Sequence, residues 1–262
     1  MRLPDILRFA RDAATGYPMR TALSVLAMSI GVAAVVVLTA LGDGARRYVV
    51  GQFSSLGTNL VIVLPGRSGT GGFNPANAIT TTPRDLTVDD AAALLRAPGV
   101  RRAAPLAVGT SEISVAGRLR EVMVAGTTAS YFPIRSFELG QGSALPDEDW
   151  GRGSSVAVIG AKIREEMFGN APAIGQLVRV GDRRLRVVGV LKPVGQGLGM
   201  NTDELVIVPV ALAQALFNSN TLFRILVEAK SREAIPEARE QALDILKQRH
   251  RGEEDVTVIT QD

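Results

Sequence analysis

The chain has 262 residues, a formal net charge of +3 and a sequence pI near 9.6. It contains no cysteine and a single histidine, which excludes disulfides, thiolate metal sites and zinc sites built from histidines. The basic residues are scattered and not interleaved with aromatic residues, so the composition gives no support to nucleic-acid binding.

A leader, residues 1–20, precedes the most apolar part of the chain. In it Leu3, Ile6, Leu7 and Ala10 recur at helical spacing, which predicts an amphipathic helix lying at a membrane surface. The leader also carries four arginines, twice as many as the segment that follows the apolar stretch. This positive-inside bias predicts a cytoplasmic leader.

Residues 21–41 contain no charged side chain. As a helix this run is about 31 Å long, close to the ~30 Å hydrocarbon core of a bilayer. We therefore predict a single transmembrane helix at 21–41 in the inner (cytoplasmic) membrane, with the main domain on the periplasmic side. A cleaved signal peptide and a buried core helix of a soluble protein are the alternatives.

Small residues recur within this predicted helix at Ala27, Gly31 and Ala34. Their spacing places them on nearly the same side, where a second membrane helix can approach closely. We predict a helix-packing face there. The alternative is the ordinary alanine and glycine content of a membrane helix.

Residues 42–58 are predicted to form a stalk that carries the chain out of the bilayer. The segment from Gly42 to Gly44 is too short for a dinucleotide-binding fingerprint, and we interpret it as a turn flanking the helix. Residues 45–56 are predicted to continue as helix.

The rest of the chain alternates short strands with short helices. Thr87 and Asp90 form a capping-box-like start for one of these helices, which ends near Pro98 and Gly99. The predicted strands are 59–64, 100–114, 119–125, 155–159, 177–180, 185–191, 204–209, 222–228 and 255–260; the predicted helices are 87–95, 161–168, 210–217 and 236–248; the predicted loops include 66–85, 140–150 and 194–200.

This order of elements predicts an α+β fold after the transmembrane helix. Residues 59–136 and 221–262 give strand–helix–strand units, and residues 137–220 form a block inserted between them. The inserted block is rich in predicted hairpins, one of which turns at Gly181 and Asp182.

No motif for binding ATP is present. The glycine-rich residues 66–72 lack the lysine and the following helix of a phosphate-binding loop. His250, the only histidine, lies at the end of a predicted helix, where a cation or a hydrogen-bond donor is favourable. We interpret it as structural.

No arrangement of nucleophile and base is convincing either. Ser154 and Ser155 lie near Lys162 in sequence, but their spacing fits no known requirement. The acidic groups at 147–149 and 253–255 are interpreted as solvated loop charges. We predict no catalytic, cofactor or metal site, and no enzyme.

Seven runs of residues follow one another in the chain: TALSVLAMSIGVAAVVVLTALGDGARRYV (21–49), SSLGTNLVIVLPG (54–66), LTVDDA (86–91), VAVIGAKIREEMFG (156–169), AIGQLVRVGDRRLRVVGVL (173–191), ELVIVPVALA (204–213) and LKQRHRGEEDVTVITQD (246–262). Together these runs resemble MacB-type ABC transporter permeases. The similarity covers nearly the whole chain in the order expected for the family. The positions that match the family motif around the membrane exit are Gly42, Gly44, Leu56, Gly57, Thr58 and Asn59.

The resemblance implies a split porter subdomain at 59–136 and 221–262, with a second subdomain inserted at 137–220. It also implies a role in which a separate ABC ATPase drives movement of the extracytoplasmic domain for efflux or substrate extraction. The implied partners are that ATPase, a second permease chain in a homodimer or heterodimer, and membrane lipid.

The sequence departs from the family at its end, where a family member would continue into a second membrane helix. The three membrane helices that follow the first one in the family, and the loop that docks on the ATPase, are not in the sequence. No nucleotide-binding domain is fused to it. We therefore expect a permease fragment, a split permease or a half-permease. The alternative is a tethered extracytoplasmic adaptor that binds a partner without transport of its own.

Overall fold

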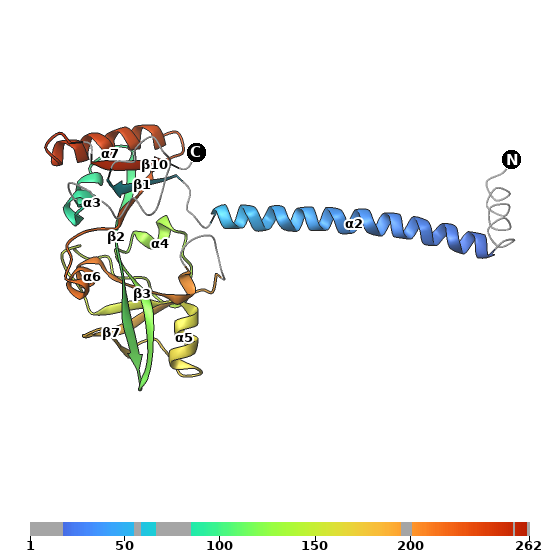
Figure 1. Cartoon of the computed structure of the whole chain (residues 1–262), viewed down its shortest axis with the longest axis horizontal. Helices are drawn as coiled ribbons and strands as arrows, with labels where there is room; N and C mark the ends of the chain where they lie inside the picture. Colours follow the sequence, from blue (N-terminus) through green and yellow to red (C-terminus); the bar gives the residue numbers. More distant parts are fainter. Residues whose placement is uncertain (1–17, 55–58, 67–84, 195–200, 254, 261–262) are drawn as a thin grey trace. The chain divides into compact units, whose positions relative to one another are not determined.

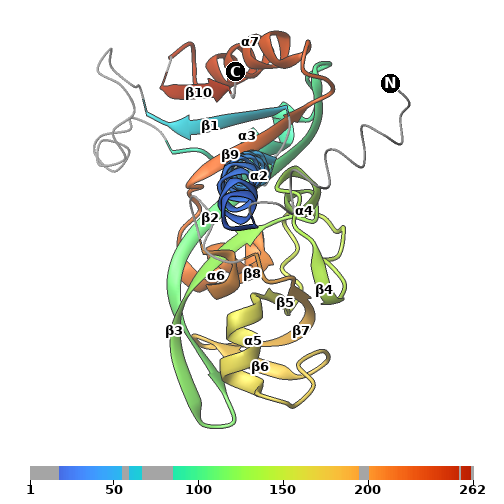
Figure 2. The same ribbon diagram turned by 90° about the vertical axis from the view of Figure 1, so that its right-hand side faces the viewer.

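The computed structural model describes residues 18–54, 59–66, 85–194, 201–253 and 255–260, with the side chains of 45–54 outside that description. The chain divides into two compact units, Met1–Gln52 and Phe53–Asp262. Figures 1 and 2 show the elements within each unit.

One continuous helix, α2 (Pro18–Ser54), covers the predicted transmembrane segment and most of the predicted stalk. Proline suits its first position, where the missing N–H has no partner to lose. The turn predicted between Gly42 and Gly44 is wrong, because α2 runs through both glycines. Glycine is tolerated in membrane helices, where the helix satisfies backbone groups that lipid cannot.

The second unit contains an antiparallel sheet with the strand order β10-β1-β9-β2, which we call the split sheet. Helix α3 connects β1 to β2, and helix α7 connects β9 to β10. This is the β-α-β-β-α-β arrangement, and it confirms the predicted split βαβ unit. The bounds are β1 Leu60–Pro65, α3 Val88–Leu94, β2 Val100–Val115, β9 Arg224–Ala229, α7 Ile235–Arg249 and β10 Val256–Thr260.

Successive residues of β1 enter different hydrophobic clusters, as the alternation of a strand requires. Val61 and Val63 belong to the cluster that includes Leu246 of α7. Leu60 belongs to a second cluster, which includes Tyr131 of the short helix α4 (Tyr131–Ile134). The split sheet is therefore covered on both faces.

β2 is 16 residues long and continues beyond the split sheet into a second group of strands. There β2 pairs with β3, β3 with β8, β8 with β5, β5 with β7, β7 with β6, and β6 again with β2. These strands close into a ring, which removes the free edges of the strands within it. The bounds are β3 Arg118–Thr127, β5 Val156–Ile159, β6 Leu177–Val180, β7 Arg183–Leu191 and β8 Leu205–Pro209.

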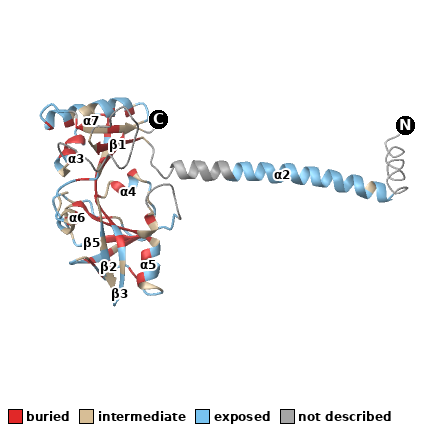
Figure 3. Ribbon diagram, in the orientation of Figure 1, coloured by how far each residue is buried: buried red, intermediate tan, exposed pale blue. Residues whose placement is uncertain are grey.

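Two helices pack on the ring, α5 (Ala161–Phe168) and α6 (Val210–Phe217). The contact between α6 and β3 depends on Gly126, because a Cβ atom there would lie 2.1 Å from the Cβ of Ala213. Figure 3 shows the buried residues gathered under these elements.

Most predicted elements of the second unit are confirmed, including helices 161–168 and 210–217 and the hairpin that turns at Gly181. The loop predicted at 140–150 is wrong at its start, where β4 (Leu139–Gly142) pairs with β7. Its sequence has no β-branched residue, so the pairing partner and not local propensity makes it a strand. Most of the loops predicted at 66–85 and 194–200 lies outside the described residues.

Candidate functional site

The first candidate site is the apolar part of α2. Within Pro18–Gly44 the most apolar 18-residue window has a mean hydropathy of 2.4, and none of that window is buried within the chain. Among the residues that the structure describes, this is the one helix long and apolar enough to cross a membrane. Its exposed valines, leucines and methionines need an apolar environment, which a bilayer supplies.

The predicted helix-packing residues Ala27, Gly31 and Ala34 all lie on α2 and are all exposed. At about 100° per residue they fall within an arc of roughly 60°. A Cβ atom added at Gly31 meets nothing within 4 Å. The face is thus available for a second helix, and its use remains a prediction.

The membrane-exit motif is only partly described. Gly42 and Gly44 lie within α2, whereas 56–58 lie outside the described residues. Asn59 has a φ of 60°, a left-handed conformation that asparagine tolerates better than most residues. Its carbonyl accepts a hydrogen bond of 2.9 Å from the N–H of Ala229. Asn59 therefore sets the start of β1 against the end of β9.

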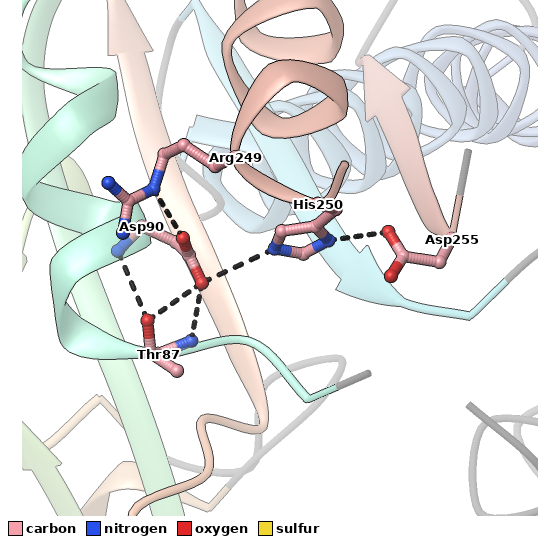
Figure 4. Close-up of polar contacts among 5 residues, drawn as sticks. All are labelled: Thr87, Asp90, Arg249, His250 and Asp255. Atoms are coloured by element: carbon pink, nitrogen blue, oxygen red, sulfur yellow. Dashed lines mark hydrogen bonds and ion pairs between the residues drawn. The ribbon is translucent and has the colours of Figure 1, made fainter. Parts of the chain in front are cut away.

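The second candidate site is a buried polar network that joins α3, α7 and β10 (Figure 4). It starts at the predicted capping box of α3, which is confirmed. The N–H and the hydroxyl of Thr87 donate to Asp90 Oδ2 at 3.0 and 2.7 Å. Asp90 is only 3% exposed, so this cap lies in the interior.

Two consecutive residues at the end of α7 complete the network. Arg249 Nε donates to Asp90 Oδ1 at 2.6 Å, and His250 Nε2 lies 3.5 Å from Asp90 Oδ2. His250 Nδ1 lies 2.5 Å from Asp255 Oδ1, just before β10. Both ring nitrogens of His250 face carboxylates, and only the doubly protonated ring can donate to both.

The electrostatics of the network centre on Asp90. Burial acts to raise the pKa of its carboxyl, but hydrogen bonds from Arg249 and Thr87 outweigh burial and hold the pKa below its ordinary value of 3.8. The charged form is thus the one that the fold stabilises. The network links α3, α7 and the start of β10 through side-chain contacts.

The network agrees with one sequence prediction and overturns another. His250 lies at the end of α7 as predicted, and it is a buried hydrogen-bonding residue. The prediction that Asp255 is a solvated loop charge is wrong, because Asp255 is 2% exposed. Its burial comes from the return of β10 beside β1, which brings it to His250, and no local sequence pattern signals that return.

The other polar residues singled out in the sequence are not brought together. Lys162 Nζ pairs with Glu204 at 2.5 Å, whereas the hydroxyl of Ser154 donates to Glu148 at 2.7 Å. Glu148 therefore organises its loop and is not simply solvated. Asp147 is exposed, as predicted.

Comparison with known proteins shows which family the chain is similar to. The chain matches the MacB-like periplasmic core domain over residues 21–245. It is 32% identical over 263 residues to the macrolide export ATP-binding/permease protein MacB 1/2 of Paracoccus denitrificans (strain Pd 1222), a match that covers 100% of this chain and 38% of the relative. It is also 32% identical over 240 residues to the pyoverdine export ATP-binding/permease protein PvdT of Pseudomonas entomophila (strain L48), covering 90% and 35% of the two chains.

Two solved structures share the fold. The periplasmic region of MacB from Actinobacillus actinomycetemcomitans matches with a TM-score of 0.65 and 18% identity, over 79% of this chain and 91% of that one. The extracellular domain of the noncanonic ABC-type transporter YknZ from Gram-positive bacteria matches with a TM-score of 0.62 and 22% identity, over 77% and 100%. The chain spans a little over a third of the length of the two relatives above.

The split βαβ sheet and the ring of strands have the fold of the periplasmic region of MacB, and a helix long and apolar enough to span a membrane precedes them in the chain. The chain belongs to the family of the MacB-like periplasmic core domain.

Proposed function

We propose that the chain is a membrane-anchored permease component of an ABC-type export system. A separate ATPase subunit hydrolyses ATP, and the extracytoplasmic domain uses the resulting motion for efflux or substrate extraction. The observation that carries the proposal is the match to the MacB-like periplasmic core domain over residues 21–245. Its relatives in Paracoccus denitrificans and Pseudomonas entomophila are named as export ATP-binding/permease proteins.

The second unit is built to receive motion from α2 through the chain. β1 is the first strand after α2, and it pairs with β10 on one side and β9 on the other. A displacement applied to the start of β1 therefore acts on the split sheet and not on a free edge. The network around Asp90 joins the helices of that sheet, so they move with it.

The proposed subdomains have the boundaries predicted from the sequence. We propose that residues 59–136 and 221–262 form the porter-like subdomain and that residues 137–220 form the inserted one. β2 connects them, because its first part pairs with β9 and its second part with β6. Residues 1–20 and 21–41 serve as cytoplasmic leader and membrane helix, and residues 42–58 as stalk.

The proposed orientation can be tested by labelling, because the natural chain has no cysteine. Asp147, which is exposed, is replaced by cysteine in one variant, and Ala13 of the leader in another. A membrane-impermeant maleimide applied to intact spheroplasts should label D147C and should reach A13C only after lysis. Labelling in the opposite order would reverse the proposed topology.

The proposed partner can be tested by photocrosslinking in the native membrane. A crosslinking amino acid in place of Arg8, on the proposed cytoplasmic side, should capture an ABC ATPase that mass spectrometry identifies. The same group in place of the exposed Lys230 is the control and should not capture it. Absence of an ATPase at position 8, with full function of residues 42–262 alone, would favour the tethered adaptor.

A further inference from the structure

Helix α4 covers the face of the split sheet that α3 and α7 leave open, and it places an unusual cluster of polar groups there. Tyr131 opens α4, Arg135 follows its last residue, and Arg224 is the first residue of β9. Since α4 contacts both β2 and β9, side chains distant in sequence meet at this point.

Tyr131 is the buried member of the cluster. Its side chain is 0% exposed, and its ring meets that of Phe137 edge to face, with centroids 5.5 Å apart. The hydroxyl is buried and forms no hydrogen bond of ordinary geometry, and Arg135 is the polar side chain that interacts with it. A buried hydroxyl without a partner costs free energy, so native structures rarely keep one unless a ligand or water completes it.

Each arginine of the cluster also has a buried nitrogen without a hydrogen-bond partner. The Nε atoms of Arg135 and Arg224 are buried without a hydrogen bond, and no carboxylate of the described residues forms an ion pair with either guanidinium. The acidic residue nearest to Arg135 in sequence, Glu138, pairs with Lys192 at 2.6 Å. Residues 55–58, 67–84 and 195–200 contain no aspartate or glutamate, whereas residue 254, which also lies outside the described residues, is a glutamate.

The three groups influence one another electrostatically. Burial lowers the pKa of Arg224, and the charge of Arg135 acts in the same direction, whereas Tyr131 opposes both. Burial raises the pKa of Tyr131 despite the two nearby guanidinium charges and a hydrogen-bonding interaction with Arg135. The cluster therefore holds two positive charges that disfavour each other and that no carboxylate of the described residues neutralises.

Both guanidinium groups are held on aromatic rings. Arg135 lies over Phe137 at 5.8 Å from the ring centroid, and Arg224 lies over Phe223 at 5.3 Å. Stacking of this kind fixes the plane of a guanidinium while its N–H groups stay free to donate. The positions of the donors are thus set before any ligand arrives.

We propose that Tyr131, Arg135 and Arg224 form a binding site for a phosphate-type oxyanion. Two guanidinium groups and a phenolic O–H offer more donors than one carboxylate has oxygens, and they match the several oxygens of a phosphate. The phosphate comes either from free phosphate or from the headgroup of a phospholipid. This inference rests on the cluster alone and does not depend on the proposed export role.

The test uses the full chain in a neutral detergent. Binding of inorganic phosphate and of glycerophosphoglycerol, a soluble phosphodiester with a lipid headgroup, is measured by calorimetry at constant ionic strength in chloride. Binding of phosphate alone assigns the free anion, and binding of the diester assigns the lipid headgroup. Binding of neither would overturn the proposal.

Substitutions in the cluster test whether phosphate binds there. Arg135→Gln and Arg224→Gln should each weaken binding at least about tenfold, because each removes charged donors. Tyr131→Phe, which keeps the ring, should weaken it less. The matched control is Arg239→Gln, on the exposed side of α7, which should bind as the natural chain does. Equal loss in the control would show a general charge effect and contradict the site.

The unfolding temperature in the absence of phosphate distinguishes a binding site from a cluster that stabilises the fold. A cluster that holds uncompensated charge should not be destabilised when one charge is removed. We therefore expect Arg224→Gln to unfold at the same temperature as the natural chain, or higher, in the absence of phosphate. The added phosphate should raise the unfolding temperature of the natural chain only. A large destabilisation of Arg224→Gln that phosphate does not affect would indicate a structural role.

Discussion

At the scale of single residues, Asp90 contacts three of the other four residues of the buried network. Its carboxylate accepts hydrogen bonds from the N-cap residue Thr87 and from Arg249 and faces His250, all while 3% exposed. Its carboxylate is favourable there because three groups donate to it or face it. Removing it would leave those donors in the interior without an acceptor.

We expect Asp90→Ala to lower the free energy of unfolding by about 2–3 kcal/mol, since it removes a cap and one partner of a partly buried ion pair. Chemical unfolding followed by circular dichroism measures this change. The control is Asp89→Ala, on the exposed side of the same helical turn, which should cost less than about 1 kcal/mol. Equal effects of the two substitutions would mean that the buried network contributes little.

Acid should weaken the same network. The pKa of Asp90 in the folded chain lies below its ordinary value of 3.8, so its contribution is complete above that value. The contribution is then lost as the pH falls through the folded-state pKa. Between about pH 6 and about pH 3 the natural chain should lose more stability than Asp90→Asn, which cannot ionise. Parallel loss in both chains would show that other groups carry the acid sensitivity.

At the scale of elements, the ring of strands depends on one close approach. Gly126 of β3 lies under α6, where an added Cβ would meet that of Ala213 at 2.1 Å. Small residues on both sides let the helix lie directly on the strand. The contact therefore fixes how α6 sits on β2, β3 and β8.

We expect Gly126→Ala to destabilise the chain by about 1–3 kcal/mol, because α6 must move to admit the methyl group. The control is Gly140→Ala in β4, where the nearest atom would be at 3.6 Å, an ordinary contact. Thermal unfolding of the two variants compares them directly. If Gly140→Ala were the more damaging, the packing described for α6 would be incorrect.

Local sequence patterns predicted those elements whose cause is local. The capping box at Thr87 and the turn at Gly181 are set by a few neighbouring residues, and both are present as predicted. β4 and α4 were not predicted, because each depends on a partner distant in sequence. β4 pairs with β7, and α4 packs on the split sheet. Asp255 was misread for the same reason, since its burial depends on a strand pairing.

The sequence also did not predict that the strands close into a ring. The pattern predicted β6 and β7 as a hairpin, but not that β6 pairs with β2 as well. The cluster of Tyr131, Arg135 and Arg224 is equally invisible in sequence, because α4 and β9 lie far apart along the chain. The family resemblance supplied the order of the elements but not these contacts.

At the scale of the whole molecule, the chain combines a helix that can span a membrane with a domain of the MacB-like periplasmic core family. We propose that nucleotide-driven motion in a partner ATPase reaches this chain. If it does, the proposed packing of two α2 helices should respond to nucleotide, since a population shift between two states changes how closely the helices approach.

The most direct test is disulfide crosslinking of single-cysteine variants in native membranes that contain the ATPase. A27C, G31C and A34C lie on the proposed packing face, and V36C lies on the opposite face of α2. We expect crosslinked dimers for the first three, with yields that differ by at least about twofold between ATP alone and ATP with vanadate. Yields that do not change with nucleotide, or equal crosslinking of V36C, would contradict the proposed coupling.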